Sequence, residues 1–212
     1  YCKNKDIKLV IGQVRSPHSN SGIFDFQYWS NANYLFSDEI EAAIIISGSF
    51  SSSEEIKKEL QTHFQKPIVS IGLDYQLSNS YYIHAECNTS YNDVVSHLKE
   101  KHGCRKFAFM TARNVNSKES EERFNAFKMA LEKNDLEYNE NRVFHASFTS
   151  STAITSLKER IKSKEDVDFD VILAANDLMA LGCLSYLQEI GIAIPQDVKV
   201  IGFDETSHAA NT

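Results

Sequence analysis

The side chains best suited to bind a small polar ligand follow two short apolar segments. Asn176 comes just after the apolar run 170–174, and Asp204 comes at the end of the run 198–203. The first run is typical of a strand buried on both faces, the second predicts another strand, and the mostly apolar segment 178–190 between them predicts a helix. Strand, helix and strand at this spacing form a parallel unit, and open α/β sheets bind ligands beyond the carboxyl ends of such strands. We therefore expect both polar side chains at a ligand-binding edge.

The ends of this helix are also marked in the sequence. Asn176 and Asp177 are residue types that begin helices, and we expect Asp177 to cap the helix rather than to touch a ligand. Gly191 has the freedom to take the left-handed conformation that often follows a helix. Pro195 then prevents the helix from continuing toward the next strand.

The same residues resemble a known family. The segment AANDLMALG at 174–182, followed by IGIAIPQDVKVIGFDE at 190–205, resembles the signature of the effector-binding core of LacI/GalR-type bacterial regulators. That core shares its fold with periplasmic sugar-binding proteins. With looser matches upstream, the resemblance covers most of residues 67–205. It implies an α/β protein with two doubly wound parallel-sheet lobes, of the periplasmic-binding-protein-like type I fold, that binds a sugar-like effector in a cleft between the lobes.

The resemblance also implies a set of ligand-binding residues: Glu86, Arg123, Phe148, Asn176 and Asp204. The planar five-donor guanidinium of Arg123 suits ligand hydroxyls, and the carboxylate of Asp204 can accept from two of them. Asn176 can donate and accept at once, and Phe148 can pack against a sugar or within the core. Glu86 and Cys87 depart from the family, whose members carry Asp-Asn there, which indicates a remodelled part of the site.

Structural interpretations stay open for the polar residues. Arg123 can be a surface residue paired with Glu119 or Glu122. Asn176 can be a turn residue before its helix, and Asp204 can belong to ordinary turn chemistry at a strand end. The sequence supports both the binding and the structural interpretation of each.

Composition and charge narrow the classes of protein. The chain has 212 residues, 42% hydrophobic and 24% charged, which suits one large α/β domain or two lobes. A formal net charge of -7 is unlike the basic surface of a nucleic-acid-binding domain. The four cysteines are scattered without a CxxC pair, which favours reduced thiols. The sequence shows neither a signal-peptide pattern nor an apolar run that could span a membrane, so we expect a cytoplasmic protein.

Alternating apolar runs predict the remaining elements. Strands are expected at 7–14, 42–46, 67–71, 81–83, 106–110 and 142–146, and helices at 24–36, around 56–64, at 91–102, around 124–131 and around 154–161, with capping boxes at Ser52 with Glu55 and at Asn116 with Glu119. We place an N-terminal lobe at 1–104 and a C-terminal lobe at 105–212. Family members carry one more strand and helix before residue 7, cross between lobes after residue 205, and in the repressors have a DNA-binding headpiece. We expect these parts to be missing here.

The implied function is binding rather than catalysis. The best-supported interpretation is the effector-binding domain of a LacI-type transcriptional regulator, a homodimer that reaches operator DNA only through its headpiece. The alternative is the same fold as the input domain of a histidine kinase or a GGDEF-type signalling protein, which the aromatic helix and the strand in the first 50 residues favour. A third possibility, a doubly wound enzyme, lacks a nucleophile with its base, and the catalytic and phosphate-binding motifs are absent. We expect no cofactor and no metal.

Overall fold

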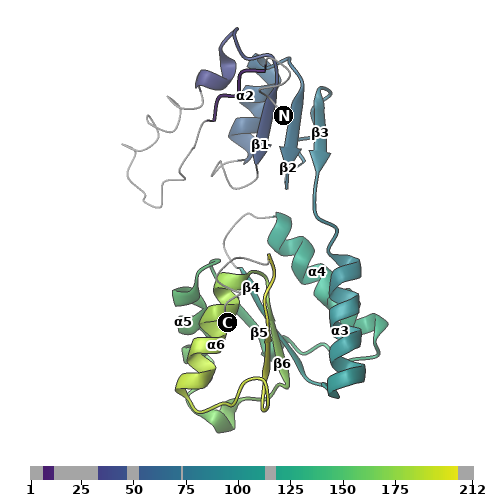
Figure 1. Ribbon diagram of the computed structural model, residues 1–212, viewed down its shortest axis with the longest axis vertical. Coiled ribbons are helices and arrows are strands. Elements are labelled where there is room, and N and C mark those ends of the chain that lie inside the picture. Colours follow the sequence, from purple (N-terminus) through teal and green to yellow (C-terminus); the bar gives the residue numbers. More distant parts are fainter. Residues whose placement is uncertain (1–6, 12–32, 47–52, 73, 113–117, 205–212) are drawn as a thin grey trace. The chain divides into compact units, whose positions relative to one another are not determined.

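The computed structural model describes residues 7–11, 33–46, 53–72, 74–112 and 118–204 (Figure 1). The chain divides into two compact units, residues 1–85 and 86–212, each with a parallel sheet. The division falls at 85/86 rather than at the expected 104/105. The reason is that helix α3 (Asn88–His102) packs on helix α4 (Lys118–Lys133), which places α3 in the second unit.

The first unit contains a three-stranded sheet in the order β1-β2-β3. Its parallel strands are β1 (Ala43–Ile46), β2 (Ile68–Ile71) and β3 (Ser80–Ile83), with helix α2 (Ser53–His63) between β1 and β2 and the 3-10 turn η2 (Asn33–Phe36) ahead of β1. Its small core consists of six buried residues, Ala43, Ile45, Leu60, Phe64, Ile68 and Tyr75. Leu60 and Phe64 come from α2 and the residue after it, so this helix covers one face of the sheet.

The opposite face of this sheet is apolar and exposed. Ile44, Ile46, Tyr81 and Ile83 all point away from the small core, and each is exposed. The strand predicted at 42–46 is present as β1, and its residues alternate between buried and exposed although all of them are apolar. Among the described residues only one face of the sheet is covered, so only every second side chain is removed from water.

Two predicted elements near the N-terminus differ from the structure. Residues 7–11 form no strand and keep large apolar side chains exposed, because a strand needs a hydrogen-bonded neighbour and an apolar run alone does not supply one. The predicted helix at 24–36 appears in its described part only as the turn η2. Residues 12–14 and 24–32 lie outside the described residues, as do Ser52 and Asn116 of the predicted capping boxes.

The second unit is a four-stranded parallel sheet in the order β5-β4-β6-β7. The strands are β4 (Phe107–Ala112), β5 (Val143–Ala146), β6 (Val171–Ala174) and β7 (Lys199–Ile201), and the helices are α3, α4, α5 (Ser150–Arg160) and α6 (Asp177–Glu189), with 3-10 turns η3 (Glu140–Arg142) and η4 (Lys164–Asp166). Figure 1 shows α3 and α4 on one side of this sheet and α5 and α6 on the other. This arrangement confirms the predicted doubly wound α/β fold for the second unit.

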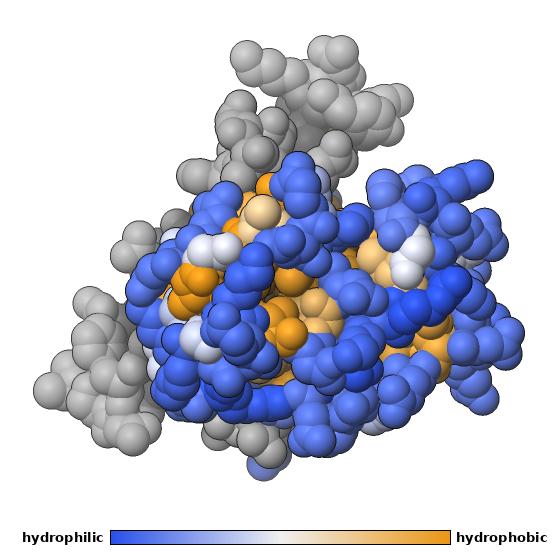
Figure 2. Space-filling view, turned by 90° about the horizontal axis from the view of Figure 1, so that it is seen from below, coloured by the Kyte–Doolittle hydropathy of each residue, from blue (hydrophilic) through white to orange (hydrophobic). Residues whose placement is uncertain are grey.

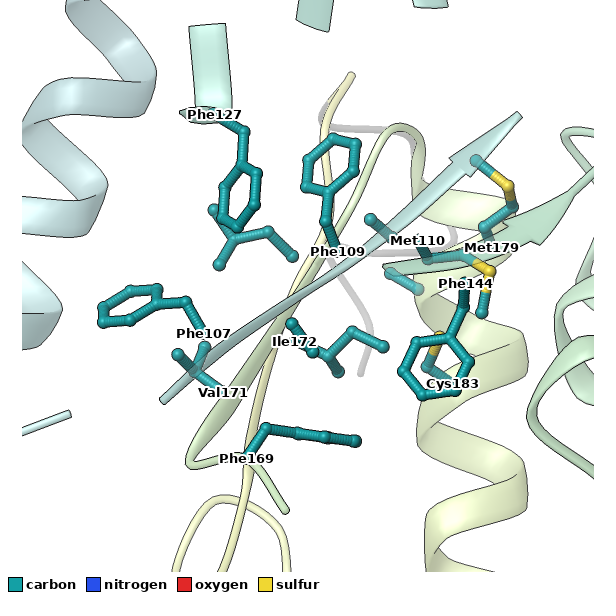
Figure 3. Close-up of a cluster of buried hydrophobic side chains, with 14 of the residues drawn as sticks. Phe107, Phe109, Met110, Phe127, Phe144, Phe169, Val171, Ile172, Met179 and Cys183 are labelled. Carbon is teal, nitrogen blue, oxygen red and sulfur yellow. The ribbon is translucent and has the colours of Figure 1, made fainter. Parts of the chain in front are cut away.

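Burial on both faces explains the composition of the central strands. Every residue of β6 and the first five of β4 are buried. Figure 3 shows the two sides of the core, with Phe109 and Phe127 close together and Met179 and Cys183 reaching the sheet from α6. The rings of Phe109 and Phe127 stack with centroids 4.6 Å apart. The surface in Figure 2 is largely hydrophilic, with hydrophobic residues in small groups between polar ones.

The end of α6 follows the predicted signal, and its start differs from the prediction by one residue. Gly103 and Gly191 take left-handed conformations after α3 and α6, with φ of 69° and 82°. Asn176, and not Asp177, caps α6, because its side-chain oxygen accepts from the backbone N–H of Met179 at 2.9 Å. Asp177 is the first residue of the helix and is buried. None of the described helices is long and apolar enough to cross a membrane.

Candidate functional site

Four of the five predicted site residues lie at the carboxyl edge of the second sheet. Phe148 follows β5, Asn176 follows β6 and Asp204 follows β7, while Arg123 lies in α4, the helix after β4. Because all four strands are parallel, their carboxyl ends meet at the same edge. The strand spacing in the sequence therefore brings these residues into one region, as expected.

Arg123 is the centre of this edge. Its side chain is almost fully buried, and Nη2 lies 2.6 Å from Oε1 of Glu119 and 3.3 Å from Oδ1 of Asp204. Nη1 donates to the backbone carbonyl of Ala175, and Cζ lies 4.1 Å from the centroid of the Phe203 ring. The pair with Glu119 that the sequence allowed is present, but Arg123 is a buried residue rather than a surface one.

Asp204 is held in an unusual environment. It has a left-handed φ of 107°, which is costly for a residue other than glycine. Partial burial raises the pKa of its carboxyl, the nearby guanidinium of Arg123 opposes this, and the charges of Asp177 and Glu119 raise the pKa further. The net shift is upward in spite of the ion pair with Arg123, chiefly because burial penalises the charged carboxylate.

Asn176 and Phe148 are joined by a hydrogen bond. Nδ2 of Asn176 donates to the carbonyl oxygen of Phe148 at 3.2 Å, while Oδ1 caps α6. Phe148 has a φ of 58° and is half-buried against the core of the second unit. The turn and core interpretations of these residues are therefore realised, and Asn176 retains one amide hydrogen and one lone pair for a further partner.

Glu86 is bound to its own helix. Its carboxylate accepts from the backbone N–H of Asn88 at 2.7 Å and of Thr89 at 3.0 Å, which lowers its pKa. These bonds satisfy N–H groups that the first turn of α3 leaves free. The described contacts do not join Glu86 to the other four residues. Its neighbour Cys87 is buried, which raises the pKa of the thiol, and lies within electrostatic range of Arg123.

Two aromatic residues of this edge were missed in the sequence. The rings of Phe203 and Tyr91 stack with centroids 5.8 Å apart, and burial raises the pKa of Tyr91. Tyr91 Oη and Arg123 Nε are buried without a hydrogen-bond partner among the described residues. Phe203 could have been suspected because it directly precedes Asp204, whereas nothing in the sequence marks Tyr91 beyond its place in the predicted helix 91–102.

The described residues contain no cluster of three or more His, Cys, Asp or Glu side chains that could hold a metal ion. The chemistry that this edge offers is hydrogen bonding. Half-exposed carboxylates accept, one asparagine amide both donates and accepts, and aromatic rings pack beside a buried guanidinium.

Comparison with known proteins agrees with this fold. Residues 95–212, more than half of the chain, match the family model of the periplasmic binding protein-like domain. The HTH-type transcriptional regulator AscG of Escherichia coli is 29% identical over 171 residues, which are 80% of this chain and 49% of the relative. Catabolite control protein A of Staphylococcus xylosus is 25% identical over 174 residues, 82% of this chain and 50% of the relative. The chain thus spans about half the length of the curated relatives it matches.

A solved structure extends the match. The crystal structure of a sugar-binding transcriptional regulator of the LacI family from Escherichia coli, complexed with phosphate, is 27% identical with a TM-score of 0.69. The alignment covers 88% of this chain and 65% of the other. The chain therefore belongs to the periplasmic binding protein-like domain family, in the form that LacI/GalR-type regulators carry.

Proposed function

We propose that the chain is the effector-binding part of a LacI-family transcriptional regulator and that it binds a sugar or a related small metabolite. Arg123, Asn176, Asp204 and Phe148 form the ligand-binding edge, with Glu86 nearby at the start of α3. The whole protein would act as a homodimer and bind operator DNA through a separate headpiece. The relatives named above are transcriptional regulators, which supports a regulatory rather than an enzymatic role.

The observation that carries this proposal is the rigid support of the acceptors. Asp204 and Glu119 are both partly exposed and both fixed by Nη2 of a single buried arginine. Arg123 is itself fixed by the Ala175 carbonyl and the Phe203 ring. Carboxylates held this way do not need to be ordered again when a ligand hydroxyl arrives, which lowers the entropic cost of binding.

The mechanism is a shift between conformations. A ligand that binds one arrangement of the protein more tightly than another favours that arrangement by its difference in affinity, and this preference changes the DNA-binding module. In this mechanism the residues at the carboxyl edge bind and orient the ligand, and no covalent bond of the ligand is broken.

A thermal-shift screen tests the proposal. A ligand present at 100 times its Kd stabilises the folded chain by about 2.7 kcal/mol, or about 5–10 °C in Tm for a chain of this size. We expect at least one sugar to produce such a shift in the wild-type chain and to lose it with Asp204→Asn. The matched control is Asp168→Asn, since Asp168 also pairs with a buried arginine, Arg142, but precedes β6. A shift that survives Asp204→Asn, or a complete lack of shifts with a folded chain, would contradict the site.

A further inference from the structure

We propose that this edge selects uncharged, hydroxyl-rich ligands and excludes their phosphorylated or carboxylated forms. The inference rests on the proposed function and narrows its ligand class. The groups that could bind an anion here are one buried guanidinium and three helix starts. The inference is drawn from the side chains and backbone groups that already bind them.

The guanidinium of Arg123 has little capacity left for an anion. Arginine binds phosphates and carboxylates with two parallel N–H donors. Here Nη2 is shared between Glu119 and Asp204, and Nη1 donates to the Ala175 carbonyl. Nε has no hydrogen-bond partner among the described residues, but it is buried behind these contacts. The Phe203 ring lies against the guanidinium. An anionic ligand would have to displace a carboxylate to reach this fork.

Three helix starts near this edge are also occupied. The N-terminus of a helix that follows a parallel strand is a common phosphate site. Asn176 takes the Met179 N–H at the start of α6, and Thr149 takes the Thr152 N–H at the start of α5. Glu86 takes two N–H groups at the start of α3. The starts of α3, α5 and α6 are therefore each capped by a side chain of the chain itself, while residues 113–117 ahead of α4 lie outside the described residues.

The groups that remain open are acceptors. The side chains of Glu119 and Asp204 are 43% and 38% exposed, whereas that of Arg123 is 7% exposed. Asp177 adds a further negative charge near Asp204. An approaching ligand meets carboxylate oxygens first, which favours hydroxyl donors. A phosphate monoester carries nearly two negative charges at pH 7 and is repelled.

Calorimetric titration of the 1–212 chain with matched pairs tests this selectivity. The pairs are glucose with glucose 6-phosphate, ribose with ribose 5-phosphate, and cellobiose with cellobiose 6-phosphate, with inorganic phosphate as a separate probe. We expect at least one uncharged member to bind, with an affinity at least ~10-fold above that of its phosphate at low salt. Inorganic phosphate is expected to produce no saturable heat.

A charge-removing variant shows whether the carboxylates cause the difference. Glu119→Gln keeps an oxygen acceptor for Arg123 but removes one negative charge. The ratio of the affinity for the uncharged sugar to the affinity for its phosphate should therefore fall about tenfold. Glu159→Gln is the matched control, because Glu159 is exposed in the last turn of α5, away from the carboxyl edge. The affinity ratio of the Glu159→Gln variant should equal that of the wild type.

The outcomes separate the two proposals. Equal or tighter binding of a phosphorylated member, binding of inorganic phosphate, or an unchanged ratio in Glu119→Gln would overturn the selectivity and leave the effector-binding role standing. Binding of no member of any pair by the folded chain would contradict the effector-binding role, and the selectivity with it.

Discussion

Two buried arginines at opposite edges of the second sheet have similar partners. Arg123 is held at the carboxyl edge by Glu119, Asp204 and a backbone carbonyl. Arg142, just before β5, is held at the amino edge by Asp168 at 3.0 Å, by Glu137 at 3.6 Å and by the Asp168 carbonyl at 2.8 Å. Both side chains are 7% exposed. The partners of a buried arginine do not by themselves reveal whether it serves a site or the fold.

The pKa values of the carboxyl groups around the two arginines are shifted in opposite directions. The side chain of Asp168 is 60% exposed and is paired with Lys106 as well as Arg142, and both cations lower its pKa. Asp204 is less exposed, and burial, together with the nearby charges of Asp177 and Glu119, raises its pKa. At the amino edge the charges compensate one another, whereas the carboxyl edge keeps a surplus of acceptors. Such a surplus is what a hydroxyl-rich ligand can use.

The largest effect is expected from Arg123→Met. The substitution leaves the Ala175 carbonyl, Glu119 and Asp204 without their shared donor in a partly desolvated place. We expect a loss of about 3–5 kcal/mol in the free energy of unfolding, measured by urea denaturation, and loss of sugar binding. An Arg123→Met variant as stable as the wild type would show that the contacts of Arg123 do not stabilise the fold.

A smaller effect is expected from Arg142→Met. The exposed carboxylates of Asp168 and Glu137 can return to water, so the loss should be about 1–3 kcal/mol, mainly from the unsatisfied Asp168 carbonyl. Sugar affinity of the folded variant should be unchanged in the same titration. A strong loss of affinity here would end the distinction between the two edges.

Phe203→Leu separates the contribution of the aromatic ring to stability from that of the ion pairs of Arg123. Leucine keeps most of the buried apolar contact but removes the ring beneath the Arg123 guanidinium and beside Tyr91. We expect a loss of about 1–2 kcal/mol. In a double-mutant cycle with Arg123→Met most of this loss should disappear, and full additivity of the two losses would argue against the contact.

The smallest and most specific effect is a pair of opposite pH dependences. The folded-state pKa of Asp168 is lowered, so its contribution to stability is present above its ordinary pKa and is lost as pH falls through the folded value. The folded-state pKa of Asp204 is raised, so its contribution is present at low pH and is lost as pH rises through the folded value. From pH 3 to 7, Asp168→Asn should become less stable relative to the wild type and Asp204→Asn more stable. Urea denaturation at each pH measures both, and slopes of the same sign would contradict the comparison.

Predictions from the sequence are most accurate for features that depend on residues within one segment. The strand before Asn176, the helix after it and the glycine at 191 follow from periodicity and capping chemistry, and all three are present. The convergence of Arg123 and Asp204 at one edge follows from parallel strands. The capping residue of α6 was misassigned by one position because Asn and Asp both suit a helix start.

The sequence predicted least where distant parts of the chain decide. Arg123 is buried because the Ala175 carbonyl and the Phe203 ring, from other elements, close around it. Residues 7–11 have a strand-like composition, but among the described residues no strand pairs with them. Periodicity within a segment reports which side chains prefer burial, and the neighbouring elements determine whether burial occurs.

The one-sided sheet of the first unit has a consequence for how the protein behaves in solution. The strand register aligns Ile44, Val69 and Tyr81 in one row across the uncovered face, and Ile46, Ile71 and Ile83 in the next. Two adjoining rows of largely exposed apolar side chains form the kind of surface that binds hydrophobic dyes and promotes aggregation. A fragment restricted to residues 1–85 should therefore bind such a dye and self-associate as its concentration rises, and a lysine at Ile44 or Tyr81 should restore its solubility.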